Sequence, residues 1–88
     1  MTAPVALITG AARRVGASIA RRLHAAGYDL ALHHRASGAD MQALVAELEA
    51  ARANSTLVLS CELADDDALP RLVADTVARF GRLDALVN

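Results

Sequence analysis

The sequence predicts an α/β fold in which helices cover both faces of a parallel β-sheet. Short, almost continuous apolar runs of four to six residues alternate with longer segments in which apolar residues recur at helical spacing. Glycines or an asparagine–serine pair separate most of these segments. The chain has 88 residues, of which 55% are hydrophobic, so it can form one small or incomplete domain with a modest core.

Each element follows from its local pattern. The predicted strands are residues 5–9, 28–33, 56–60 and 84–87. Three predicted helices lie between them, and their apolar stripes are Val15, Ile19, Leu23 and Ala26; Met41, Leu44, Val45, Leu48 and Ala51; and Leu69, Leu72, Val73, Thr76, Val77 and Phe80. Gly27 and Gly81 are typical helix ends, and Asp65, Asp66 and Asp67 offer a helix cap and first-turn acids before a tolerable Pro70.

The resulting order is β-α-β-α-β-α-β, which predicts the N-terminal portion of a Rossmann-like, doubly wound parallel sheet with right-handed crossovers. In such a sheet a switch point lies beside the first strand, and ligands bind at the carboxyl ends of the strands there. The turn that begins at Gly10 directly follows the first strand. We therefore expect a ligand at this turn.

The stretch ITGAARRVG, residues 8–16, has features that suit a dinucleotide. Glycine lets the backbone approach a pyrophosphate closely, and the start of a helix presents unpaired N–H groups and a positive dipole. Gly10 and Gly16 fit these roles. Arg14 could bind a phosphate oxygen or an anionic substrate edge. The alternative is an ordinary strand-to-helix turn, with Arg13 and Arg14 as solvated side chains.

The end of the second strand favours NADPH as the cofactor. Enzymes that select NAD usually carry an acidic residue there, whereas this chain reads His33-His34-Arg35. Arg35 supplies a cation for the 2′-phosphate of NADPH, and Ser37 supplies a hydroxyl. A metal site formed by His33 and His34 is disfavoured, because adjacent strand residues point to opposite faces and no third ligand is evident.

Four stretches resemble the short-chain dehydrogenase/reductase family. TGAARRVG is similar to the family's cofactor loop, T-G-x-x-x-G-x-G, in the T-G-x-x-x-R-x-G form of pteridine reductases. LHHRAS is similar to the end of the second strand in the same enzymes. It departs from them in carrying His34 in place of the usual aromatic residue and Ala36 in place of a serine. CEL carries Glu62 where the family commonly has aspartate, and GRLDALVN leads to the asparagine expected to bond to the threonine of the glycine turn, here Asn88 and Thr9. The resemblance implies that the cofactor is bound by Gly10, Arg13, Arg14, Val15, Gly16, His34, Arg35, Ser37, Glu62, Leu63 and Asn88.

The resemblance further implies an NADPH-dependent oxidoreductase that reduces a pterin or dihydrofolate-like substrate by hydride transfer and forms a homotetramer. A 3-oxoacyl carrier-protein reductase is the alternative. The family's Tyr-x-x-x-Lys pair is missing, because the sequence has no lysine and its single tyrosine, Tyr28, is followed four residues later by Leu32. We therefore expect residues 1–88 to be the N-terminal part of a single NADP-binding domain without catalytic residues. A noncatalytic nucleotide-binding domain is the third possibility, if the natural chain ends at Asn88.

Composition limits the remaining classes. Nine arginines against ten acidic residues leave a net charge of −1, which provides no general attraction for nucleic acid or a membrane surface. A single cysteine, Cys61, cannot form an internal disulfide, and no stretch resembles a signal peptide or a membrane span. We expect a cytoplasmic protein whose partner is a small-molecule substrate.

Overall fold

The computed structural model describes residues 3–63 and 67–88, and within these it confirms the predicted alternation of strands and helices. The elements are β1 (Val5–Ile8), α1 (Arg14–Ala25), β2 (Asp29–His34), α2 (Gly38–Ala51), β3 (Thr56–Ser60), α3 (Ala68–Phe80) and β4 (Ala85–Val87). The strands form one parallel sheet in the order β3-β2-β1-β4. This is the Rossmann-like, doubly wound arrangement that the sequence predicts.

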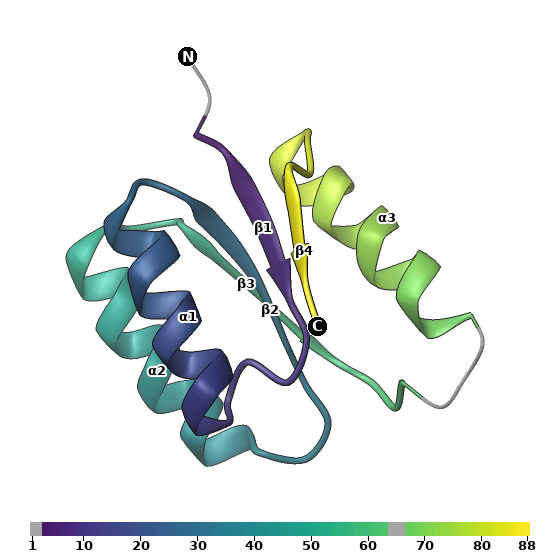
Figure 1. Ribbon diagram of the computed structural model, residues 1–88, viewed down its shortest axis with the longest axis horizontal. Helices are drawn as coiled ribbons and strands as arrows, with labels where there is room; N and C mark the ends of the chain where they lie inside the picture. The colour runs from purple at the N-terminus through teal and green to yellow at the C-terminus, as the bar shows by residue number, and fades with distance from the viewer. Residues whose placement is uncertain (1–2, 64–66) are drawn as a thin grey trace.

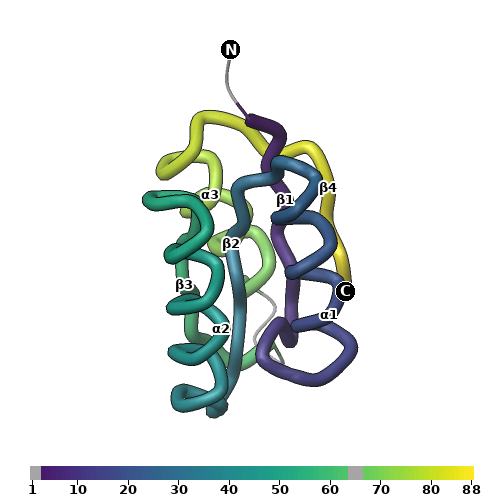
Figure 2. Tube along the Cα trace, turned by 90° about the vertical axis from the view of Figure 1, so that its left-hand side faces the viewer, coloured from purple at the N-terminus to yellow at the C-terminus, as the bar shows by residue number. Residues whose placement is uncertain are grey.

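Helices cover both faces of the sheet. Helices α1 and α2 lie on one face and α3 lies on the other (Figure 1), and the turned view shows the same layers (Figure 2). Strand β1 is buried along its whole length because it lies between these layers and has a neighbour on each side. This burial explains why its sequence is an unbroken apolar run rather than an alternating one.

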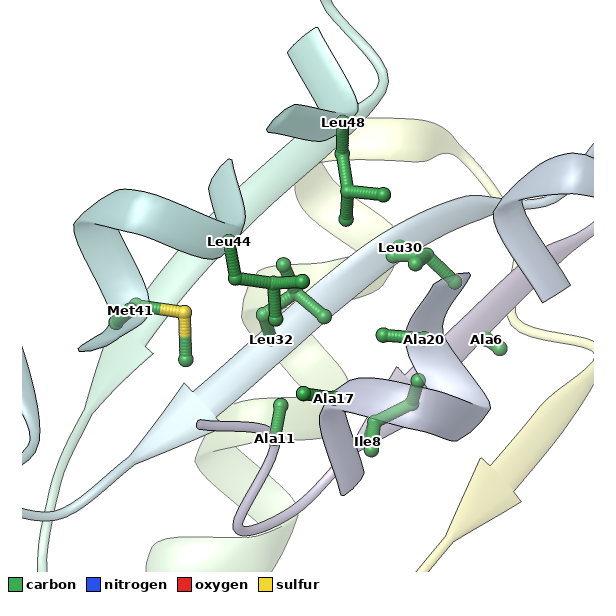
Figure 3. Packing of buried hydrophobic residues seen from close by; sticks show 10 residues of the cluster. All are labelled: Ala6, Ile8, Ala11, Ala17, Ala20, Leu30, Leu32, Met41, Leu44 and Leu48. Atoms are coloured by element: carbon green, nitrogen blue, oxygen red, sulfur yellow. The ribbon is translucent and has the colours of Figure 1, made fainter. Parts of the chain in front are cut away.

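The hydrophobic core is divided by the sheet. Figure 3 shows the larger part, in which α1 and α2 pack on alternate residues of β1 and β2. Its buried members are Ala6, Ile8, Ala11, Ala17, Ala20, Leu30, Leu32, Met41, Leu44 and Leu48. The smaller part lies between the sheet and α3 and consists of Leu7 of β1, Ala31 of β2 and Leu72 of α3. Cys61 packs against it as a partly buried side chain.

The predicted helical stripes are partly wrong. Val15 is 72% exposed and Ala26 is also exposed, whereas Ile19 and Leu23 pack against the core as predicted. The buried residues of α1 are Ala17, Ala20 and His24. Ala51 at the end of α2 is exposed as well.

On α3, Leu69 and Val77 are 36% and 41% exposed. This helix buries Ala68, Leu72 and Thr76, a narrower stripe at four-residue spacing, and Val73 packs against the same core as a partly buried side chain.

Several element boundaries differ by one residue from the predicted ones. Strand β1 ends before Thr9, β2 runs from Asp29 to His34, and β4 begins at Ala85, one residue after the predicted start. Asp67 occupies the N-cap position of α3, whereas Asp65 and Asp66 lie outside the described residues.

Candidate functional site

An open cavity of about 670 Å³ lies at the carboxyl ends of the strands. The chain winds from β1 outward to β2 and β3, and then α3 returns it to β4 on the other side of β1. The two directions of winding separate at β1, so the turn between β1 and α1 stands at the switch point of the sheet. Residues from this turn and from the segments after β2, β3 and β4 line the cavity.

The turn is built around its two glycines. Gly10 has φ of +62°, a conformation that glycine adopts without steric cost. The turn is held by backbone hydrogen bonds from Ala11 N–H to the His33 carbonyl (2.8 Å) and from Arg13 N–H to the Gly10 carbonyl (3.2 Å). A Cβ added to Gly16 would lie 2.5 Å from the Gly10 oxygen, so only glycine allows α1 to start this close to the turn.

The first turn of α1 faces the cavity and suits an anion. The N-cap residue, Arg13, makes no side-chain hydrogen bond to the helix, and the first turn contains no acidic residue. Arg13, Val15 and Gly16 line the cavity. Because the first N–H groups of a helix lack intrahelical acceptors and carry partial positive charge, this end can hold a phosphate group. The close backbone approach at Gly16 and the uncapped helix start both fit a dinucleotide.

The structure brings together ten of the eleven predicted cofactor-binding residues. Those that line the cavity are Gly10, Arg13, Val15, Gly16, His34, Arg35, Ser37, Glu62, Leu63 and Asn88. Arg14 is the exception: it is the first residue of α1, it is exposed, and it lies outside the cavity lining. The cavity is also lined by the apolar residues Ile8, Ala12, Ile19 and Val87, which were not predicted. The sequence does not distinguish an apolar side chain that lines a cavity from one that packs in the core.

Arg35 and Glu62 form an ion pair at the cavity, with 2.7 Å between Arg35 Nε and a carboxylate oxygen of Glu62. Their side chains are 74% and 49% exposed. The sequence predicted that both bind the cofactor, with Arg35 on its 2′-phosphate, and did not predict that they pair with each other.

The expected contact between Thr9 and Asn88 is present. The side-chain hydroxyl of Thr9 lies 3.3 Å from Asn88 Oδ1 and 3.3 Å from the Val87 carbonyl, and the Thr9 backbone N–H donates to the same carbonyl at 2.9 Å. These bonds attach the end of β4 to the start of the glycine turn. Asn88 therefore has a structural role in addition to its place at the cavity.

Histidines 33 and 34 differ in surroundings. His33 is 3% exposed, and both of its ring nitrogens contact the backbone, at Gly10 and Cys61. His34 is half-buried, and its Nδ1 atom is buried without a hydrogen-bond partner among the described residues. No group of three or more potential metal ligands occurs within residues 3–63 and 67–88. His33 was missed as a site residue; a histidine at the end of a predicted buried strand was the available signal.

Comparison with known proteins assigns the family. A family model described as short chain dehydrogenase matches residues 4–88. The chain belongs to the short-chain dehydrogenase family. This membership accounts for the glycine turn, the parallel sheet and the cavity at the switch point in a single explanation.

Relatives within the family include reductases of two kinds. The chain is 41% identical to pteridine reductase 1 of Leishmania tarentolae over an alignment of 104 residues, which covers 99% of this chain and 36% of that protein. It is 37% identical over 83 residues to a 3-oxoacyl-[acyl-carrier-protein] reductase of Staphylococcus aureus strain Mu50, covering 94% of this chain and 33% of the relative. A Synechocystis 3-oxoacyl-[acyl-carrier-protein] reductase is 34% identical over 88 residues. The chain thus spans about a third of the length of these relatives.

Proposed function

We propose that residues 1–88 form the N-terminal, cofactor-binding part of a single Rossmann domain in an NADPH-dependent short-chain reductase. The observation that carries this proposal is Arg35, which lies at the cavity just past the end of β2 where an NAD-specific site would place a carboxylate. When bound, the nicotinamide cofactor would supply a hydride. The residues of this chain would bind and orient it, and the catalytic acid would come from elsewhere in the protein.

Two groups of the cofactor, the pyrophosphate and the 2′-phosphate, would find partners at the site. The glycine turn and the uncapped start of α1 would hold the pyrophosphate, and Arg35 with Ser37 would hold the 2′-phosphate. Arg35 is paired with Glu62 in this structure, but an ion pair this exposed contributes little free energy. A phosphate dianion can therefore displace Glu62 from the guanidinium.

For the substrate, we propose a pterin or dihydrofolate-like heterocycle. Support comes from the arginine of the T-G-x-x-x-R-x-G motif and from the 41% identity to a pteridine reductase. A 3-oxoacyl thioester is the second candidate, favoured by relatives at 34–37% identity. By the same resemblance, we propose a cytoplasmic homotetramer; no helix in the described part of the chain is long and apolar enough to cross a membrane.

The cofactor assignment is tested by comparing NADPH with NADH. We expect the full-length protein to show higher kcat/KM with NADPH. Arg35→Ala should lower kcat/KM for NADPH roughly tenfold to hundredfold, because a charge-assisted contact is lost, and should leave NADH almost unchanged. Arg21→Ala is the matched control, since Arg21 is also an exposed arginine in an ion pair but lies outside the cavity lining. A preference for NADH, or equal losses for both cofactors, would contradict the assignment.

The substrate assignment is tested at Arg14. We propose that Arg14, the arginine of the T-G-x-x-x-R-x-G motif, contacts the substrate; it is exposed and lies outside the cavity lining. Arg14→Gly should therefore lower kcat/KM for dihydrobiopterin roughly tenfold to hundredfold while the apparent affinity for NADPH stays the same. Turnover of a 3-oxoacyl thioester serves as the comparison. If the wild type reduces the thioester and no pterin, the second candidate replaces the first.

A further inference from the structure

His33 connects the glycine turn to the segment that follows β3. It is the last but one residue of β2, and its side chain is 3% exposed. On one side, the backbone N–H of Gly10 donates a hydrogen bond to His33 Nδ1 at 3.2 Å. On the other side, His33 Nε2 lies 2.9 Å from the carbonyl oxygen of Cys61, the residue that follows β3.

These two partners determine the protonation of the ring. A backbone N–H can only donate, so Nδ1 has to carry a lone pair, and a carbonyl can only accept, so Nε2 has to carry the proton. His33 is therefore a neutral imidazole in its Nε2–H form. A second proton would be placed on Nδ1, directly opposite the N–H of Gly10, and that hydrogen bond would be lost while the bond to Cys61 remained.

Loss of the bond between Gly10 and His33 would affect the part of the turn that determines where α1 begins. The Gly10 carbonyl accepts from Arg13 N–H and is the oxygen nearest to a Cβ built on Gly16. A displacement of Gly10 would therefore move the start of the helix, whose N–H groups face the cavity. His33 itself would not touch the cofactor phosphates through either ring nitrogen, because both are engaged with backbone.

We propose that neutral His33 is a positioning residue, which holds Gly10 in the geometry that binds a dinucleotide, and that protonation of His33 releases Gly10 and weakens binding at acid pH. Only the consequence for dinucleotide affinity rests on the proposed function. Other ionisable groups adjoin the same space: Arg13 from the glycine turn, His34 and Arg35 from the end of β2, and Cys61 and Glu62 from the segment after β3. The test has to separate the proton on His33 from protons on these groups.

The first test uses the unaltered full-length protein without cofactor. Hydrogen exchange of the Gly10 amide is compared with that of Ala11, whose N–H donates to the backbone oxygen of His33 and keeps its acceptor when the ring is protonated. Exchange is measured from pH 8 to 5, with intrinsic exchange rates removed and the protonation of the His33 ring followed by NMR. Protection of Gly10 should be about tenfold lower relative to Ala11 when the ring is protonated than when it is neutral. A constant ratio, or ring nitrogen shifts of the Nδ1–H form, would overturn the proposal.

The second test uses variants and ADP-ribose, which carries the pyrophosphate but not the titrating 2′-phosphate. His33→Asn keeps an acceptor near the Nδ1 position and cannot take up a proton, so ADP-ribose affinity should stay near that of the wild type at pH 8 and lose its acid dependence. His33→Leu should bind about tenfold more weakly at pH 8. His34→Asn is the control, and it should retain the fall in affinity at acid pH.

The outcomes separate this proposal from the proposed function. An unchanged acid dependence in folded His33→Asn, with folding checked by thermal unfolding, would overturn the positioning role. If no variant and not even the wild type bound ADP-ribose, the proposed function would fail, and the exchange ratio of Gly10 to Ala11 would still decide whether His33 holds the turn.

Discussion

At the scale of single residues, the two glycines of the turn are required by its geometry. Gly10 needs its positive φ, and Gly16 needs the absence of a Cβ because the Gly10 oxygen is so close. The sequence offered an ordinary tight turn and a cofactor turn as alternatives. The structure shows a tight turn that lines the cavity, and this geometry is compatible with both.

The close contact at Gly16 makes a quantitative prediction. Gly16→Ala should lower the free energy of unfolding by about 1 to 3 kcal/mol, because backbone must shift to admit the Cβ. Gly38→Ala is the matched control: Gly38 begins α2, a Cβ there meets nothing within 4 Å, and the change should be neutral or stabilise by up to about 1 kcal/mol. Urea denaturation of both variants measures the difference. Equal free energies of unfolding for the two would show that the turn relaxes without cost.

At the scale of elements, Glu49 controls how α2 passes into β3. Its carboxylate accepts hydrogen bonds from the backbone N–H groups of Asn54, Ser55 and Thr56 and from the Thr56 hydroxyl, at 2.6 to 3.1 Å. Asn54 has φ of +62°, which turns the chain so that these groups face one carboxylate. The Thr56 hydroxyl, followed by the Asn54 amide, holds the pKa of Glu49 below its ordinary value of 4.5.

This lowered pKa predicts how stability depends on pH. Because the folded state binds the proton on Glu49 less readily than the unfolded state, the stabilisation is complete above pH 4.5 and is lost as the pH falls through the folded-state pKa. Glu49→Gln should cost about 1 to 2 kcal/mol at pH 7, with the difference from the wild type shrinking at lower pH. Glu47→Gln, at an exposed ion pair on the same helix, should change stability by less than about 0.5 kcal/mol. A pH-independent difference for Glu49→Gln would exclude the carboxylate as the cause.

At the scale of the whole molecule, the site exists because distant segments end at the same edge of the sheet. The glycine turn, the end of β2, the segment after β3 and the end of β4 all reach the cavity. Hydrogen bonds also link these segments directly: Thr9 donates to the Val87 carbonyl of β4, Gly10 N–H donates to the His33 ring, and the other ring nitrogen of His33 contacts the Cys61 carbonyl. The proposed role of His33 would act through these contacts.

The sequence by itself determined the order of the elements, the parallel sheet and most of the cavity lining. These follow from information that is local in the chain: apolar runs, helical spacing and the glycines of one turn. Ten of the eleven residues that the family resemblance implies lie at the cavity, which is formed where the strand ends of the parallel sheet share one edge.

Only the tertiary structure decided which side chains are buried, which line the cavity and which pair with each other. In the structure, Val15 and Leu69 of the predicted apolar stripes are exposed, and Arg14 lies outside the cavity lining. Arg35 pairs with Glu62, and both ring nitrogens of His33 have a backbone partner. The physical reason is that burial and pairing depend on which elements lie opposite a side chain. Those elements are tens of residues away along the chain, and the local sequence pattern contains no information about their distance or angle.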